Sequence, residues 1–230
     1  PNIPVNKYRD LILGHPEWKQ YNTYKQGYNR YGLSMTSLDG GYSGVPDLES
    51  LGEYYNETGI IHRDSDFKTR TPLSCEIPEV NELLNFFGED LGRSHFLRLD
   101  KGGFFPPHRD HNFRLPNNMF RIIVPFYGFH SAQMSWIFDG KVVQLREGCA
   151  YFMNTAKTHS LFSYTDGCTM LVFNVSATED TMKELTGKPG AKCPENNKSI
   201  PLISSNGSAC VSCGLCVYGK ADIRFSASKK

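Results

Sequence analysis

Residues 94–110 read SHFLRLDKGGFFPPHRD, and they are followed by MFRIIVPFY at 119–127 and CTMLVFNV at 168–175. Such short runs, apolar or alternating between apolar and polar residues, are typical of β-strands. Further runs of this kind occupy 134–138, 141–145, 149–153 and 159–163. Asp139-Gly140, between two of the runs, predicts a hairpin turn. Many short strands without helices between them predict an antiparallel jelly-roll core, cupin-like in its architecture.

The segments on either side of this core have a different pattern. Residues 1–93 mix short helices and loops, with helical spacing of apolar residues after Pro46 and again from Pro78 to Gly88, and a polar loop at 56–74. We therefore expect a mainly β fold with flanking helices. Its main domain would cover 1–187, with a helical and loop part at 1–93, the jelly roll at 94–176 and a closing helix at 177–187. A cysteine-rich tail follows at 188–230.

Composition limits the classes of protein that this chain can belong to. Of its 230 residues, 39% are hydrophobic and 21% charged, which is a globular composition and excludes a disordered chain. With 25 basic and 24 acidic residues, the whole chain is not a strong polyanion binder. No apolar run approaches the roughly 18 to 20 residues of a membrane span, and residues 1–10 lack the pattern of a secretory signal. We expect a cytoplasmic, reducing location.

Histidines and an acid occur at a spacing that suits a metal site. His108 and Asp110 are two residues apart, so on one strand their side chains point to the same face. His159 opens a later strand that can return beside the first. Two imidazoles and one carboxylate form the facial set that binds non-heme Fe(II) and leaves three positions open. We predict that His108, Asp110 and His159 are the catalytic metal ligands.

The order of these elements resembles a known enzyme superfamily. The segments 96–100, 107–110, 120–125 and 155–162 are similar to those of the 2-oxoglutarate and Fe(II)-dependent oxygenases. Within that superfamily they most resemble the prolyl and aspartyl/asparaginyl hydroxylase branch, including small phage-encoded members. The resemblance implies a double-stranded β-helix holding Fe(II), with 2-oxoglutarate and dioxygen as co-substrates. It also implies hydroxylation of an amino-acid or peptidyl substrate, with proline as the first candidate.

The far carboxylate of 2-oxoglutarate needs a cation, and arginine suits it because its planar fork binds both oxygens. One family pattern places an arginine about ten residues after the second histidine, but Thr169 stands there in this chain. Arg121 lies on an apolar strand after the His-x-Asp motif and is our first choice for this role. Arg98 and Lys157 are the alternatives.

The tail carries a second group of metal-ligand residues. Cys193, Cys210, Cys213 and Cys216 supply four thiolates, which suit a zinc site or an iron–sulfur cluster, and spacing alone leaves both open. The tail is also basic, so nucleic acid is a further, less favoured partner.

Two other functions compete with the oxygenase. One is a jelly-roll metal protein of cupin type that works without 2-oxoglutarate, and the other is a degenerate barrel that binds partners through its cysteine-rich tail.

Overall fold

A computed structural model describes residues 3–25, 27–110, 119–153, 155, 157–176, 178 and 180–181. The cysteine tail and most of the expected closing helix lie outside these residues, so the predictions for them stay predictions. The helices of the described part are α1 (Arg9–Leu13), α2 (Leu51–Thr58), α3 (Pro72–Glu76) and α4 (Pro78–Phe87), with 3-10 turns η1 (Val5–Tyr8), η2 (Asp64–Asp66) and η3 (Gly88–Asp90). In these residues no helix has the length and hydropathy needed to cross a membrane.

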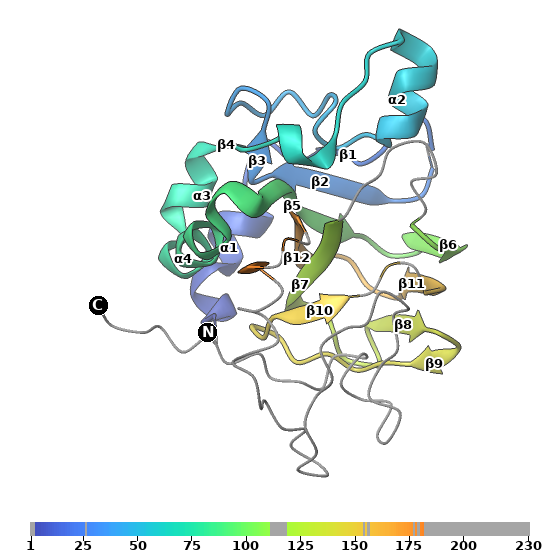
Figure 1. The fold of residues 1–230 in the computed structure, drawn as a ribbon. Coiled ribbons are helices and arrows are strands. Elements are labelled where there is room, and N and C mark those ends of the chain that lie inside the picture. The colour runs from blue at the N-terminus through green and yellow to red at the C-terminus, as the bar shows by residue number, and fades with distance from the viewer. Residues whose placement is uncertain are drawn as a thin grey trace.

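Two antiparallel sheets form the body of the molecule (Figure 1). The larger sheet contains, in spatial order, β1 (Lys19–Gln20), β2 (Arg30–Ser34), β5 (Leu91–Leu99), β12 (Cys168–Ser176), β7 (Met119–Tyr127) and β10 (Tyr151–Met153). The smaller sheet contains β6 (Phe104–His108), β11 (His159–Ser163), β8 (Met134–Phe138) and β9 (Lys141–Val142). A short ribbon pairs β3 (Thr36–Ser37) with β4 (Thr69–Arg70).

The path of the chain between the sheets shows the fold class. From β5 onward the chain crosses to the other sheet at almost every connection, and β8 and β9 stay together as a hairpin. The last strand, β12, returns between β5 and β7, while β11 returns between β6 and β8. This order is that of a double-stranded β-helix, so the predicted jelly roll is confirmed.

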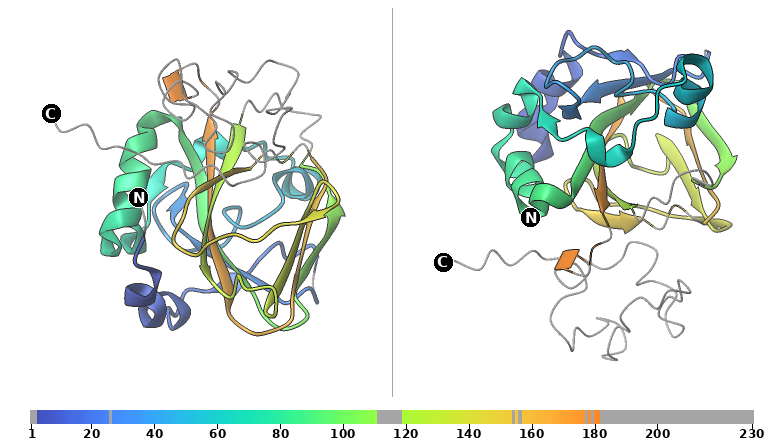
Figure 2. Two further views of the ribbon diagram at one scale, coloured as in Figure 1. Left: turned by 90° about the horizontal axis from the view of Figure 1, so that it is seen from below. Right: turned by 45° about the horizontal axis from the view of Figure 1, so that its top comes forward.

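Each face of the larger sheet buries its own set of apolar residues. The face toward the smaller sheet packs residues such as Leu97, Ile123 and Val172 against Trp136 and Leu161. The opposite face packs alternate residues of the same strands against α1, α3 and α4. Figure 2 shows these helices on one side of the larger sheet and the smaller sheet on the other. Alternation along each strand thus separates a helix-covered outer core from a barrel interior.

Local sequence patterns correctly predict several elements. Helix α4 runs over the expected residues and ends where Gly88 takes a positive φ. The hairpin between β8 and β9 turns at Asp139 and Gly140, both with positive φ, as a two-residue turn of this type requires. The second strand of that hairpin is shorter than expected and ends at Val142.

The N-terminal part is where the expectation of helices and loops alone is wrong. β2 pairs along β5 and extends the larger sheet. β2 contains Gly32, which has low strand propensity. A Cβ at this position would lie 2.7 Å from Leu48 Cδ2, so close packing against Leu48 explains why glycine occurs there. The helix expected from Pro46 begins only at Leu51, because Ser50 is extended. The stretch 56–74 contains the end of α2 together with η2, β4 and the start of α3.

Candidate metal centre

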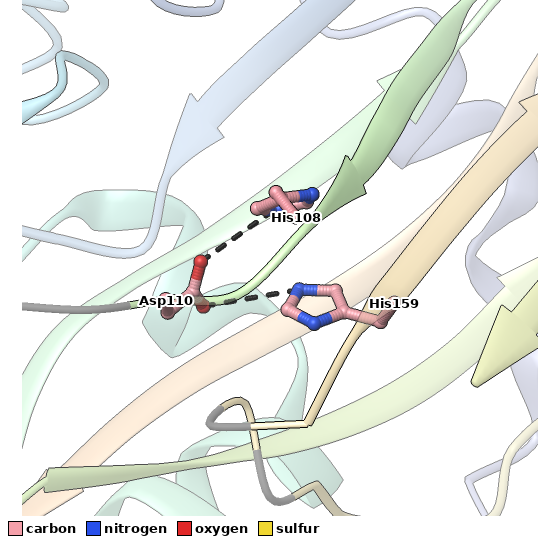
Figure 3. A group of neighbouring side chains, drawn as sticks. All are labelled: His108, Asp110 and His159. Carbon is pink, nitrogen blue, oxygen red and sulfur yellow. Dashed lines mark ion pairs between the residues drawn. The ribbon is translucent and has the colours of Figure 1, made fainter. Parts of the chain in front are cut away.

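Three side chains converge where β6 ends and β11 begins. Strand pairing places His159 opposite His108. β6 ends at His108, so Asp110 does not continue the strand as expected, but its backbone N–H donates to the Thr155 carbonyl at 2.9 Å. This bond ties Asp110 to the loop before β11. One ligand atom from each of the three side chains lies within 4.8 Å of the others, and Figure 3 shows them facing one another. The structure thus brings the predicted triad together.

Backbone carbonyls set the orientation of both imidazoles. Nδ1 of His108 lies 2.7 Å from the carbonyl of Pro106, and Nδ1 of His159 lies 2.9 Å from the carbonyl of Lys157. A carbonyl only accepts hydrogen bonds, so each Nδ1 is the donor, and in a neutral ring this tautomer leaves the lone pair on Nε2. The Nε2 atoms of His108 and His159 lie 3.5 Å and 4.0 Å from carboxylate oxygens of Asp110. Both rings therefore present the nitrogen that a metal binds.

The protonation states around Asp110 suit a metal cation. Burial by itself would raise the pKa of Asp110, but the Arg121 guanidinium and the two imidazoles more than offset it and hold the pKa well below its usual range. Nη1 of Arg121 lies 2.9 Å from Asp110 Oδ2. Burial also lowers the pKa of His159, which is 3% exposed. An ionised carboxylate and neutral imidazoles are the forms in which these groups ligate metals.

A pocket opens beside the three side chains. Its polar lining includes Tyr21, His95 and Arg121 besides the two histidine ligands, while much of its remaining wall is apolar, with Leu97, Ile123, Trp136 and Met170. The pocket therefore offers a small organic molecule an apolar space whose polar groups gather near the candidate metal ligands.

The structure separates the three predicted cations. Arg121 lines the pocket. Arg98 points to the other face of β5, where it pairs with Asp100 at 3.4 Å and packs on Trp18. Lys157 Nζ lies 3.6 Å from Asp139 Oδ2, and Lys157 is not part of the pocket lining. The backbone carbonyl of Lys157 nevertheless orients His159. Thr169 is buried and donates to the Gly167 carbonyl. Arg121 is thus the predicted cation that can reach a ligand in this pocket.

His95 is a pocket residue that the sequence motifs did not predict. His95 is 2% exposed, and its Nδ1 has no hydrogen-bond partner in the described residues. Burial, together with Arg93 and Arg121, holds its pKa well below the usual range. The available signal was its place two residues before Leu97, because alternate residues of β5 face the pocket.

The predicted tail ligands Cys193, Cys210, Cys213 and Cys216 fall outside the described residues. The described cysteines, Cys75, Cys149 and Cys168, form no disulfide with one another.

Comparison with known proteins yields short or distant similarities. No family model matches the chain. A stretch of 39 residues is 59% identical to the Gene 88 protein of Mycobacterium phage L5, and 40 residues are 50% identical to that of Mycobacterium phage D29. These matches cover 17% of this chain and only 16% and 17% of the phage proteins.

Solved structures similar to the chain have low TM-scores. KdgF from Halomonas sp. is 15% identical, with 40% of this chain and 74% of that one covered and a TM-score of 0.30. A predicted oxalate decarboxylase from Thermotoga maritima is 15% identical, with 40% and 72% covered and a TM-score of 0.31. An RmlC-like cupin from Desulfovibrio desulfuricans is 20% identical, with 36% and 70% covered and a TM-score of 0.28. The jelly roll of this chain accordingly rests on its own strand order.

Proposed function

We propose that the protein is a 2-oxoglutarate- and Fe(II)-dependent oxygenase that hydroxylates an amino-acid or peptidyl substrate. The observation that carries the proposal is the pair of Nε2 atoms facing one carboxylate, with both Nδ1 atoms bonded to backbone carbonyls. This donor set fits Fe(II), because two imidazoles and a carboxylate leave coordination positions for other ligands. Bound Fe(II) would supply the oxidation in which 2-oxoglutarate and dioxygen yield succinate, carbon dioxide and a hydroxylated carbon.

The residues of this chain have separate roles in that reaction. His108, Asp110 and His159 would hold the metal, and the carbonyls of Pro106 and Lys157 keep the two rings oriented. Arg121 would bind a carboxylate of 2-oxoglutarate, because its guanidinium supplies a positive charge on the pocket wall. The neighbouring Leu97, Ile123 and Met170 are apolar and cannot pair with a carboxylate. The apolar wall would exclude water from the reacting centre. The substrate class, with proline as the first candidate, rests on the sequence resemblance alone.

Formation of succinate tests the proposal. Protein loaded anaerobically with Fe(II) and then given 2-oxoglutarate and air should form succinate, and candidate amino acids or peptides should gain one oxygen atom. His159→Ala should abolish succinate formation, because a three-ligand site loses much of its metal affinity with each ligand. The matched control is His130→Ala. His130 is an exposed histidine in the loop that connects β7 to β8. Normal succinate formation in His159→Ala would remove this residue from the site.

A metal protein of cupin type without 2-oxoglutarate is the second candidate. One observation favours it. Arg98 and Lys157 lie away from the pocket, and Arg121, the remaining predicted cation, already pairs with Asp110. This protein would bind metal at the same three residues but form no succinate. A degenerate barrel that only binds partners is less favoured, because the ligand set is assembled and its imidazoles are oriented.

A further inference from the structure

Arg121 is held by a line of polar side chains that leads away from the metal centre. Its Nε donates to Oδ1 of Asn174 at 3.1 Å, while its Nη1 contacts Asp110. Asn174 lies directly opposite Arg121 in the pairing of β12 with β7 and is 4% exposed. Because its amide oxygen faces Arg121, the amide nitrogen faces the other way and donates to Oδ1 of Asp64 at 3.0 Å. Both ends of the amide are thus engaged, which fixes its orientation.

Asp64 is anchored in its turn by a buried arginine. Arg93 Nε lies 2.8 Å from Asp64 Oδ1, and its Nη1 donates to the carbonyl of Glu49. The backbone of Asp64 packs against Gly92, where a Cβ would lie 2.7 Å from the Asp64 carbonyl oxygen. The absence of a side chain at Gly92 therefore lets η2 approach β5 closely enough for these contacts.

We propose that Asn174 and Asp64 are positioning residues that hold Arg121 against Asp110, so that this carboxylate binds the metal through one oxygen. The inference rests on the proposed metal centre. A carboxylate can ligate through one oxygen or through both. Oδ2 of Asp110 is buried, has no hydrogen-bond partner among the described residues, and forms an ion pair with Nη1 of Arg121 at 2.9 Å. If the ion pair with Arg121 keeps Oδ2 from the metal, Oδ1, which lies 3.5 Å from His108 Nε2, would be the ligand atom of Asp110. The three residues would then supply three ligand atoms and leave three positions open.

The number of open coordination positions on the metal would determine whether both co-substrates can bind. A chelating 2-oxo acid takes two positions and dioxygen takes one, so a carboxylate bound through both oxygens would leave one position too few. Asn174 and Asp64, which touch neither metal nor pocket ligand, would in this way preserve the capacity of the site for two co-substrates.

Mn(II), used alone as the probe, tests the inference without turnover. We would titrate the full chain and its Asn174→Leu and Asp64→Asn variants with Mn(II) by electron paramagnetic resonance. Water-proton relaxation would count the water molecules on the bound ion. Each variant should carry fewer bound waters and bind Mn(II) more weakly, by at most about tenfold, because both residues act through Arg121 and do not contact a metal ligand themselves. Because the residues act in one line, the double variant should be little worse than Asn174→Leu alone.

The matched control is Asn81→Leu. Asn81 of α4 accepts a hydrogen bond from Arg70 in the same kind of arginine–asparagine contact, remote from the pocket. It should leave Mn(II) binding unchanged. Asn174 is buried, so circular dichroism and thermal melting would check that Asn174→Leu folds. If it does not fold, the inference is tested with Asp64→Asn alone, because Asp64 is less buried.

Each outcome separates the inference from the proposed function. Unchanged Mn(II) affinity and water number in the folded variants would overturn the positioning role, whatever the enzyme activity. If the parent binds Mn(II) and the variants lose affinity and bound waters, but no succinate forms with Fe(II), the oxygenase proposal fails and the positioning role stands. Absence of Mn(II) binding by the parent chain would overturn both.

Discussion

Arg121 lines the pocket, and its guanidinium forms an ion pair with Asp110, a candidate metal ligand. From sequence alone, Arg121→Ala is expected to weaken 2-oxoglutarate binding with iron affinity nearly unchanged. The structure changes the second half of that expectation, because the guanidinium lies 2.9 Å from Asp110. Losing it leaves a buried carboxylate without its main compensating charge and free to rotate. The side chain therefore serves the metal ligand as well as the pocket.

We predict that Arg121→Ala raises the apparent 2-oxoglutarate KM by about ten- to a hundredfold, the effect of losing a charge-assisted contact. It should also weaken Mn(II) binding. Lysine should restore part of the KM, since it keeps the charge but loses the fork. Succinate formation at varied 2-oxoglutarate measures this, with Arg98→Ala as the control on the other face of β5. An unchanged KM in Arg121→Ala with a raised one in Arg98→Ala would move the assignment to Arg98.

Among the elements, β5 depends on a glycine for its approach to η2. A Cβ at Gly92 would lie 2.7 Å from the Asp64 carbonyl oxygen and 2.5 Å from Met119 Cε. We predict that Gly92→Ala lowers the free energy of unfolding by about 1 to 3 kcal/mol, the usual cost of overpacking. Gly52→Ala in α2 is the matched control, because no heavy atom lies within 4 Å of its added Cβ. Urea unfolding measures both, and equal stabilities would contradict the crowding.

A second element-level contact joins η1 to β7. The Tyr127 hydroxyl donates to the Val5 carbonyl at 2.7 Å. Burial raises the pKa of Tyr127 well above that of a free tyrosine. A pKa that is raised on folding stabilises the protein fully below the unfolded value of about 10, and this stability is lost as the pH rises above it.

We therefore predict that the parent protein loses stability between about pH 8 and pH 10.5 more steeply than Tyr127→Phe, which has no hydroxyl to ionise. At the lower pH the variant should be less stable by about 1 kcal/mol, for the lost hydrogen bond. Urea unfolding at several pH values gives both slopes. Parallel slopes would show that the phenol does not contribute to the pH dependence.

For the whole molecule we predict two independent metal sites. The tail thiolates at 188–230 are soft ligands that suit zinc or an iron–sulfur cluster, whereas the His/Asp site suits an exchangeable Fe(II). In the full chain, Cys213→Ser should remove metal from anaerobically purified protein and leave Mn(II) binding at the barrel unchanged. Metal analysis measures the first effect and titration the second. An unchanged metal content would show that Cys213 is not a ligand.

Features that depend on local pattern could be predicted from the amino-acid sequence. Short apolar runs predict β5, β7 and β12, which are buried on both faces, and alternating runs predict β8 and β11, whose burial repeats every two residues. Asp139-Gly140 predicts the hairpin, because its turn needs particular backbone angles. The three candidate metal ligands were also predicted, but the reason given for Asp110 was wrong. β6 ends at His108, and a backbone hydrogen bond to Thr155, instead of strand alternation, places Asp110.

Which polar residues line the pocket depends on how strands far apart in the sequence come together. Its position after the His-x-Asp motif favoured Arg121 over Arg98, but the tertiary structure shows that Arg121 lines the pocket while Arg98 pairs with Asp100 on the other face of β5. The hydrogen bond from Arg121 to Asn174 spans 53 positions and the one from Asn174 to Asp64 spans 110. β2 likewise joins the larger sheet through pairing with β5 rather than through its own sequence. Periodicity reports which side of an element is buried, whereas partners this distant are set by how the sheets close around the barrel.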